Sequence, residues 1–89
     1  MLSKKVIIAN KLGLHARPAM VFVEVASKYN SKVKVRRTDS DDHFDGKSIM
    51  QLLMLAATEG TEIEIVAEGP DAQDAIGDLA TLVMNDFDE

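Results

Sequence analysis

The sequence predicts a small mixed α and β fold whose elements follow the order βαββαβα, and three observations support this prediction. Short apolar or alternating stretches of strand length alternate with longer stretches whose apolar residues recur every three or four positions. No low-complexity tract, long linker or short-period repeat interrupts that alternation. A chain of 89 residues provides one modest hydrophobic core, so we expect a single domain over residues 1–89.

The first half of the chain contains two predicted strands around one predicted helix. Residues 6–9 are apolar and predict a buried strand, which the turn residues 10–13 end. Over residues 16–29 the apolar side chains recur at spacings of three and four, which predicts an amphipathic helix with Pro18 near its start. Residues 32–36 alternate valine with Lys or Arg and predict a half-buried strand with a cationic outer face.

The middle of the chain predicts a hairpin followed by a second helix. Residues 38–46 are rich in Asp and Ser, which indicates a turn and at most a short edge strand. Ser48 and Gln51 match a capping box at a helix start. Gly60 is placed to end this helix. Its expected inward side chains are those of Ile49, Leu52, Leu53 and Ala56.

The last two predicted elements are a strand and a helix. Residues 62–65 alternate Glu with Ile, so we expect a neighbouring antiparallel strand whose Glu side chains face Lys34 and Arg36. Gly69 and Pro70 precede the last helix. Its predicted buried stripe consists of Ala72, Ala75, Ile76, Leu79, Leu82 and Val83. The acidic residues 86–89 are expected to form a solvated terminus.

Charge is distributed unevenly along the chain. All ten Lys and Arg lie within residues 1–47, whereas ten of the fifteen acids lie within residues 48–89, and the net charge is −5. We expect the two halves to interleave and neutralise each other across the sheet; a basic docking surface around the site is the alternative. The acidic balance argues against nucleic-acid binding, and no stretch is long enough for membrane insertion. The chain has no cysteine, which agrees with the cytoplasmic location that we expect.

Chemistry is concentrated in Gly13-Leu14-His15-Ala16-Arg17-Pro18-Ala19. Gly13 loosens the backbone before a histidine at a helix start, where the first N–H groups attract anions. The positive end of a helix disfavours imidazolium, so we expect a neutral His15 with a lone pair available for attack on phosphorus. The N–H groups of Ala16 and Arg17 and the Arg17 guanidinium can then bind phosphate oxygens. The motif alone leaves open a histidine that is only a surface or capping residue.

This segment resembles the active-site stretch of the HPr family, the histidine-containing phosphocarriers of the phosphoenolpyruvate-dependent phosphotransferase system. Residues 47–50, Lys-Ser-Ile-Met, are similar to the family's regulatory-serine segment. Residues 59–61 and 67–69 are similar to the entries to its last strand and last helix. The resemblance covers the whole chain and implies an α+β open-faced sandwich, with a four-stranded antiparallel sheet and three helices on one face. It does not separate the sugar branch from the nitrogen-related NPr branch.

The resemblance also implies a function. His15 would accept a phosphoryl group on Nδ1 from enzyme I and pass it to IIA-type domains for sugar uptake or regulation, while Arg17 stabilises the transferred charge. Such transfer depends mainly on positioning and electrostatics, so we expect a monomeric carrier rather than an enzyme, without cofactor or metal. An apolar docking patch near His15 is expected because methionine adapts to several partners, with core packing as the alternative, above all for Leu53. The patch consists of Met20, Ile49, Met50 and Leu53.

Ser48 has two predicted roles. As an N-cap it accepts a hydrogen bond from the helix backbone. In many family members the matching serine is phosphorylated by HPr kinase/phosphorylase, and a dianion there would disturb docking. Gln51 stands where the serine-regulated branch commonly has glycine, which weakens this second role. A non-catalytic regulatory module, signalling through phosphorylation of His15 or Ser48, is therefore the alternative function. His43 among acidic residues fits no usual metal-ligand spacing.

Overall fold

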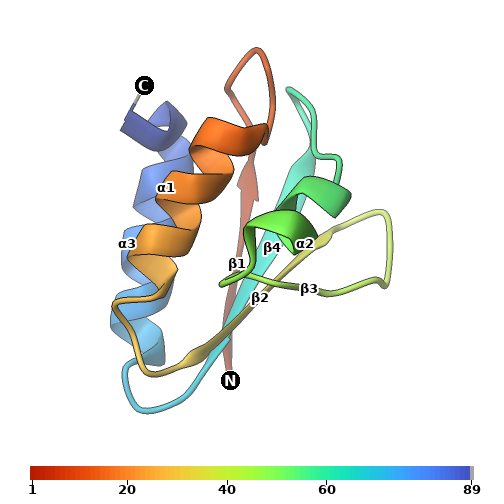
Figure 1. The fold of residues 1–89 in the computed structure, drawn as a ribbon. Helices are drawn as coiled ribbons and strands as arrows, with labels where there is room; N and C mark the ends of the chain where they lie inside the picture. Colours follow the sequence, from red (N-terminus) through yellow and green to blue (C-terminus); the bar gives the residue numbers. More distant parts are fainter. Residues whose placement is uncertain (89) are drawn as a thin grey trace.

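The computed structural model describes residues 1–88 and has a four-stranded antiparallel sheet with three helices on one face (Figure 1). The order along the chain is βαββαβα, as predicted. The sheet order is β1-β4-β2-β3, so strands from the two halves of the chain interleave. The elements are β1 (Leu2–Ile7), α1 (Ala16–Ala26), β2 (Lys32–Arg37), β3 (Phe44–Asp45), α2 (Ile49–Met54), β4 (Glu62–Glu68), α3 (Ala72–Met84) and the short 3-10 helix η1 (Asp86–Asp88).

Strand pairing brings the basic and acidic halves together. Arg36 of β2 lies opposite Glu64 of β4, and Arg36 Nε is 2.8 Å from Glu64 Oε1. The hydrogen bond from Arg36 holds the pKa of Glu64 below its ordinary value of 4.5. The predicted charge pairing is therefore confirmed for Arg36. It is wrong for Lys34, which lies opposite Val66, because the alternation of Glu with Ile in β4 ends at Ile65.

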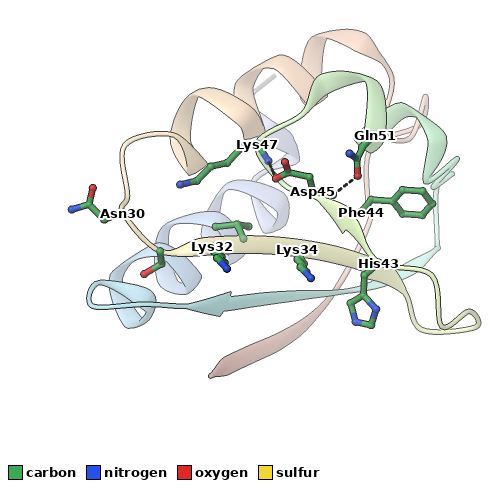
Figure 2. Close-up of a pocket in the computed structure, with 10 residues that line it drawn as sticks. Asn30, Lys32, Lys34, His43, Phe44, Asp45, Lys47 and Gln51 are labelled. Carbon is green, nitrogen blue, oxygen red and sulfur yellow. Dashed lines mark hydrogen bonds between the residues drawn. The ribbon is translucent and has the colours of Figure 1, made fainter.

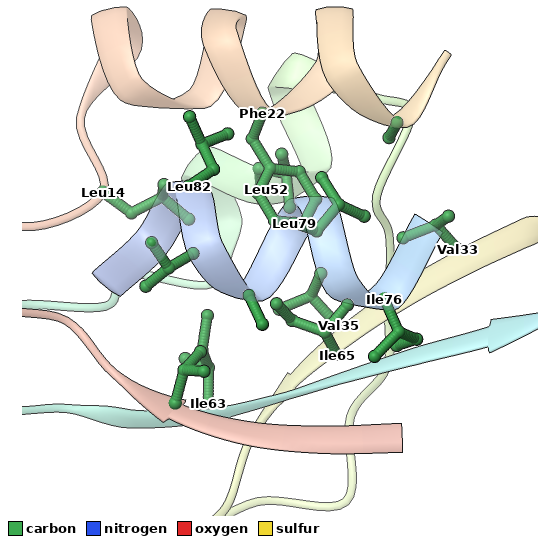
Figure 3. Close-up of a cluster of buried hydrophobic side chains, with 14 of the residues drawn as sticks. Leu14, Phe22, Val33, Val35, Leu52, Ile63, Ile65, Ile76, Leu79 and Leu82 are labelled. Carbon is green, nitrogen blue, oxygen red and sulfur yellow. The ribbon is translucent and has the colours of Figure 1, made fainter. Parts of the chain in front are cut away.

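The core lies between the sheet and the three helices. Phe22 of α1, Leu52 of α2 and Leu79 of α3 meet above the inward side chains of β2 and β4 (Figure 3). The predicted stripe of α3 is buried. The first strand is not buried on both faces as predicted. The strand runs from Leu2 to Ile7, so Ile8 and Ala9 of the predicted strand lie beyond its end. Val6 and Ile8 are buried, but Ile7 is 56% exposed, because the helices cover only one face of the sheet.

Helix α1 is shorter than predicted and ends at Ala26 instead of Tyr29. Beyond it, Lys28 and Tyr29 donate backbone hydrogen bonds over three residues, to Val25 O and Ala26 O, so the chain tightens into a turn. The Tyr29 hydroxyl donates to the carboxylate of Asp78 on α3. Tyr29 therefore fits the helical spacing of the apolar residues, but it lies in the turn after α1 and anchors that turn to α3.

Helix α2 differs more from its prediction. Leu52 is buried, whereas Ile49 and Leu53 are 37% and 41% exposed, and the exposed Ala56 lies beyond the helix. The helix ends at Met54 because Ala56 adopts a left-handed backbone (φ 54°), so Gly60 does not end it. Since this leaves fewer than two turns, the helix presents only a narrow face to the core.

Half of the predicted capping box forms. Ser48 Oγ accepts a hydrogen bond from Gln51 N–H at 3.2 Å, as predicted. Gln51 Oε1 does not return to Ser48 but accepts from Asp45 N–H at 2.8 Å. The N–H of Ser48 donates to Asp45 O instead, at 3.2 Å. The glutamine thus ties the helix start to β3.

The C-terminal segment is not simply solvated. Phe87 is 2% exposed and belongs to the core, although Asp86 and Phe87 both have left-handed backbones, with φ of 54° and 59°. Each such residue costs about 1–2 kcal/mol. Burying a phenylalanine ring returns about 1.5–3 kcal/mol, which offsets much of that strain. The prediction is therefore wrong for Phe87. The Asp88 side chain and Glu89 lie outside the described residues.

Asp71 ties the turn before β2 to the start of α3. Its Oδ2 accepts from Asn30 N–H at 2.9 Å, and its Oδ1 accepts from Ser31 N–H at 2.9 Å and from the Ser31 hydroxyl. Ser31 itself is fully buried. These hydrogen bonds hold the pKa of the Asp71 carboxyl below its ordinary value of 3.8, and the bond from the Ser31 hydroxyl has the largest effect.

We expect Asp71→Asn to lower the Tm at neutral pH by removing one acceptor oxygen. Because the folded-state pKa lies below the unfolded value, the wild-type carboxylate stabilises the fold fully above the unfolded pKa. That contribution disappears as the pH falls through the folded pKa. Thermal unfolding followed by circular dichroism from neutral to about pH 2 should therefore show the two Tm values converging. A Tm difference that is constant over this range would contradict this role.

Candidate functional site

His15 is the N-cap residue of α1. Its backbone is extended (φ −88°, ψ −171°), and its carbonyl accepts the first helical hydrogen bond from Ala19 N–H at 3.0 Å. The residue is half-buried, and its Nε2 atom has almost no solvent-accessible surface. The imidazole therefore lies at the helix start, with Nε2 as its shielded nitrogen.

The loop before His15 is fixed by a turn and by the segment after α2. Gly13 N–H donates to Asn10 O at 2.9 Å, and Leu14 N–H donates to Ala57 O at 2.9 Å. Gly13 has a left-handed backbone (φ 69°), and a Cβ there would lie 2.4 Å from Ala57 O. Leu14 is 5% exposed and anchors the loop in the core. Only glycine therefore allows the two backbones to approach this closely.

The helix start presents groups that can bind an anion. The N–H groups of Ala16 and Arg17 precede the first intrahelical hydrogen bond, and both residues are exposed. Pro18 is buried and has no N–H to offer. The first turn of α1, all of which the structure describes, contains no acidic side chain. An incoming phosphate would meet two N–H groups and one guanidinium without a competing carboxylate in that turn.

The predicted docking residues lie on α1 and α2, two helices that pack against each other on the same face of the sheet (Figure 1). Met20 and Met50 are 50% and 76% exposed. Leu53 is also exposed, so packing in the core, the alternative for this residue, is wrong. Sequence reasoning missed Leu12 and Met54, which are 75% and 66% exposed. The spacing of four between Met50 and Met54 could have indicated the latter.

A hollow of about 470 Å³ lies apart from His15, between β2, β3 and the chain entering α2 (Figure 2). Lys32, Lys34 and His43 lie on one side of β2, away from Lys47 and Gln51 on the other. Lys47 Nζ donates to Tyr29 O at 2.8 Å. The cations around this hollow therefore do not converge on one point. Among the side chains that the structure describes, no group of three His, Cys, Asp or Glu is placed to hold a metal ion.

The site at the start of α1 defines a class of protein that carries a group between partners. Its half-buried histidine lies beside the exposed residues Ala16 and Arg17, and apolar side chains are exposed on α1 and on α2. Residues 2–85 match the family model described as the PTS HPr component phosphorylation site. The chain therefore belongs to the HPr family, the phosphocarrier proteins of the phosphotransferase system.

Relatives and solved structures agree with this assignment. The chain is 46% identical to the phosphocarrier protein HPr of Pseudomonas aeruginosa, over 96% of this chain and 93% of that protein. It is 38% identical to the phosphocarrier protein NPr of Escherichia coli strain K12, over 92% and 90%. The crystal structure of HPr-C-His from Thermoanaerobacter tengcongensis matches with a TM-score of 0.93 and 38% identity, over 100% and 98%.

These findings confirm the resemblance and the α+β open-faced sandwich predicted from it. The chain is a phosphocarrier, so it carries a group rather than acting as a catalyst. Both HPr and NPr occur among its relatives, which leaves the branch open. Among the described residues, no helix is both long and apolar enough to cross a membrane.

Proposed function

We propose that His15 accepts a phosphoryl group from phospho-enzyme I and transfers it to IIA-type domains for sugar uptake, regulation or both. The observation that carries this proposal is the position of His15 at the open start of α1 in a chain of the HPr family. The half-buried ring is held in place by its loop yet lies beside the exposed residues Ala16 and Arg17.

The transfer step follows from the chemistry of imidazole. An unprotonated ring nitrogen attacks phosphorus, a P–N bond forms, and the bond between phosphorus and the donor atom breaks. Because Nε2 is shielded, Nδ1 is the nitrogen that we assign as acceptor. The N–H groups of Ala16 and Arg17 and the Arg17 guanidinium stabilise the phosphoryl oxygens in both directions of transfer. No cofactor or metal is needed for these steps.

Partners would dock on the apolar surface beside the site. Exposure of the predicted patch on α1 and α2 supports this role: Met20, Ile49, Met50 and Leu53. Donor and acceptor proteins would use the same surface in turn, which suits the adaptable methionine side chain. That the protein is a monomer and that it is located in the cytoplasm both stay predictions. The similar solved structures include dimers. The net charge of −5 argues against nucleic acid as a partner.

Ser48 keeps its second predicted role as a phosphorylation site. It is half-buried as the N-cap of α2 and directly precedes Ile49 and Met50 of the docking patch. A dianion there would change the charge of the surface that partners contact. Modification of Ser48 by HPr kinase/phosphorylase therefore stays a prediction.

The decisive test is to incubate the purified protein with labelled phosphoenolpyruvate and enzyme I and to map the product. We expect an acid-labile adduct within residues 13–19. No adduct, or an adduct elsewhere, would overturn the proposal. Adding a IIA domain then separates the two functions: passage of the label supports a relay, whereas retention on His15 supports the regulatory module.

Arg17→Glu is expected to slow phosphoryl transfer by about 10- to 100-fold, because a carboxylate replaces the guanidinium that we propose stabilises the phosphoryl oxygens. Lys28→Glu is the matched control, since Lys28 is an exposed cation just beyond the C-terminal end of α1. Stopped-flow or quenched-flow rates should fall for Arg17→Glu alone, with both variants folded by circular dichroism. If both variants transferred the phosphoryl group equally slowly, net charge and not the position of Arg17 would govern the transfer rate.

A further inference from the structure

Arg37, at the end of β2, makes a directed set of contacts that the phosphocarrier chemistry above does not use. Its Nε and Nη2 donate to the two carboxylate oxygens of Asp39, each at 3.1 Å. Its Nη1 donates to the backbone oxygen of Ala56 at 3.2 Å. Asp39 thus fixes the plane of the guanidinium and directs the remaining nitrogen at the segment that follows α2.

Two hydrogen bonds hold the backbone of Ala56: its N–H donates to Leu53 O at 3.2 Å, and its carbonyl accepts from Arg37. Ala56 has a left-handed conformation (φ 54°), which is unfavourable for any residue with a Cβ. Its side chain is exposed, so burial of that side chain does not hold the conformation. The hydrogen bond from Arg37 restrains the Ala56 carbonyl and therefore the orientation of the peptide that joins Ala56 to Ala57.

The next carbonyl along the chain holds the loop of His15. Ala57 is 4% exposed, and its oxygen accepts the hydrogen bond from Leu14 N–H at 2.9 Å. Gly13 packs against the same carbonyl and against Thr58 Cα. Any rotation of the Ala56–Ala57 peptide would therefore move the residue that directly precedes His15.

We infer that Arg37 is a positioning residue, which sets the orientation of the His15 imidazole through the left-handed Ala56 and the Ala57–Leu14 hydrogen bond. This inference rests on the proposed function of His15. Arg37 does not contact the phosphoryl group in this scheme; it fixes the backbone on which the acceptor is mounted. Small displacements of a reacting group slow transfer strongly, so loss of the restraint should affect rate more than docking.

The first experiment measures the rate of labelling of His15 by phospho-enzyme I as a function of carrier concentration. Arg37→Ala should lower kcat at least ~10-fold with little change in KM, because the docking patch is unaltered. Lys34→Ala, which removes an exposed cation from the same strand, should keep the wild-type kcat. Arg37→Lys should be about as slow as Arg37→Ala, because lysine retains the charge but cannot form the fork. Wild-type kcat in Arg37→Lys would overturn the inference.

A rescue separates positioning from a loss of folding. Glycine adopts the left-handed conformation without penalty, so Arg37→Ala combined with Ala56→Gly should recover kcat to within ~3-fold of wild type. No recovery in a double variant that unfolds at the Tm of Arg37→Ala or above would contradict the mechanism. The outcomes also separate the two proposals. An unlabelled wild-type protein removes the proposed function of His15, whereas a labelled wild type with an equally fast Arg37→Ala removes only the role of Arg37.

Discussion

Replacing His15 by alanine is expected to abolish labelling by phosphoenolpyruvate and enzyme I. The imidazole of His15 is the proposed nucleophile, and an alanine side chain has no atom that can accept a phosphoryl group. The fold should survive, because the backbone of residue 15 and not its side chain accepts the first hydrogen bond of α1. A half-buried substitution of this kind costs about 1 kcal/mol. The measurement is incorporation of label into the folded variant at saturating enzyme I.

His43 provides a matched control, because the chain has two histidines and His43 lies in the exposed turn before β3. Its Nδ1 lies 3.1 Å from Asp41 O, and, unlike His15, it is not the N-cap of α1, α2 or α3. His43→Ala should therefore incorporate label as fast as wild type. Full labelling of His15→Ala, with loss in His43→Ala, would reverse the assignment of the acceptor.

Gly13→Ala should have the second largest effect, because it damages both the fold and the site. The new Cβ would lie 2.4 Å from Ala57 O and 2.8 Å from Thr58 Cα, so the two backbones must separate. Strain at the left-handed residue and loss of the Leu14–Ala57 hydrogen bond together cost about 2–4 kcal/mol. Because Leu14 is displaced from Ala57, we expect His15 to shift and phosphoryl transfer to slow by about 100-fold.

Gly60→Ala reports the cost of backbone strain without the steric clash. Gly60 also has a left-handed backbone (φ 87°), but a Cβ there would meet no atom within 4 Å. It should therefore lose stability through backbone strain alone, about 1–2 kcal/mol, and keep a transfer rate close to wild type. Chemical denaturation and quenched-flow labelling of both variants provide the comparison. A Gly60→Ala variant that transfers as slowly as Gly13→Ala would show that general destabilisation, not displacement of Leu14, explains the slow rate.

Periodicity predicted the elements that bury a complete face. The stripe of α3 and the inward valines of β2 were correct because a long helix or an alternating strand contributes many side chains to one core. Periodicity failed where an element is short or where a run of apolar residues suggested burial on both faces. Helix α2 is too short to present a stripe, and β1 has one open face, so apolar Ile7, Ile49 and Leu53 are exposed.

Backbone conformation was the second source of error. The sequence offered Gly60 as the end of α2, but a non-glycine residue, Ala56, takes the left-handed conformation, held in part by Arg37. Likewise, the acidic residues around Phe87 predicted an exposed segment, but its ring is buried in the core despite the left-handed backbone there. Both outcomes depend on tertiary contacts distant in sequence, which local patterns do not contain.

The candidate site was predicted more completely than the packing. His15, Arg17 and the helix start belong to one short segment, so their proximity follows from local structure alone. The residues that hold this segment in place were missed because they lie elsewhere in the chain. The Ala57 carbonyl accepts from Leu14 N–H, and Arg37 donates to the carbonyl of Ala56. Arg37 lies just beyond the predicted strand over residues 32–36, and its contacts distinguish it from the other cations of β2, such as Lys34.

The identity of the phosphorylated ring nitrogen tests the central claim most directly. Protein labelled with ¹⁵N in its histidine rings, phosphorylated through enzyme I and observed by ³¹P–¹⁵N NMR, reports which nitrogen is bonded to phosphorus. Because Nε2 of His15 is shielded at the start of α1, we expect phosphorus to be bonded to Nδ1 of His15. A bond to Nε2 of the same ring, or to either nitrogen of His43, would contradict it.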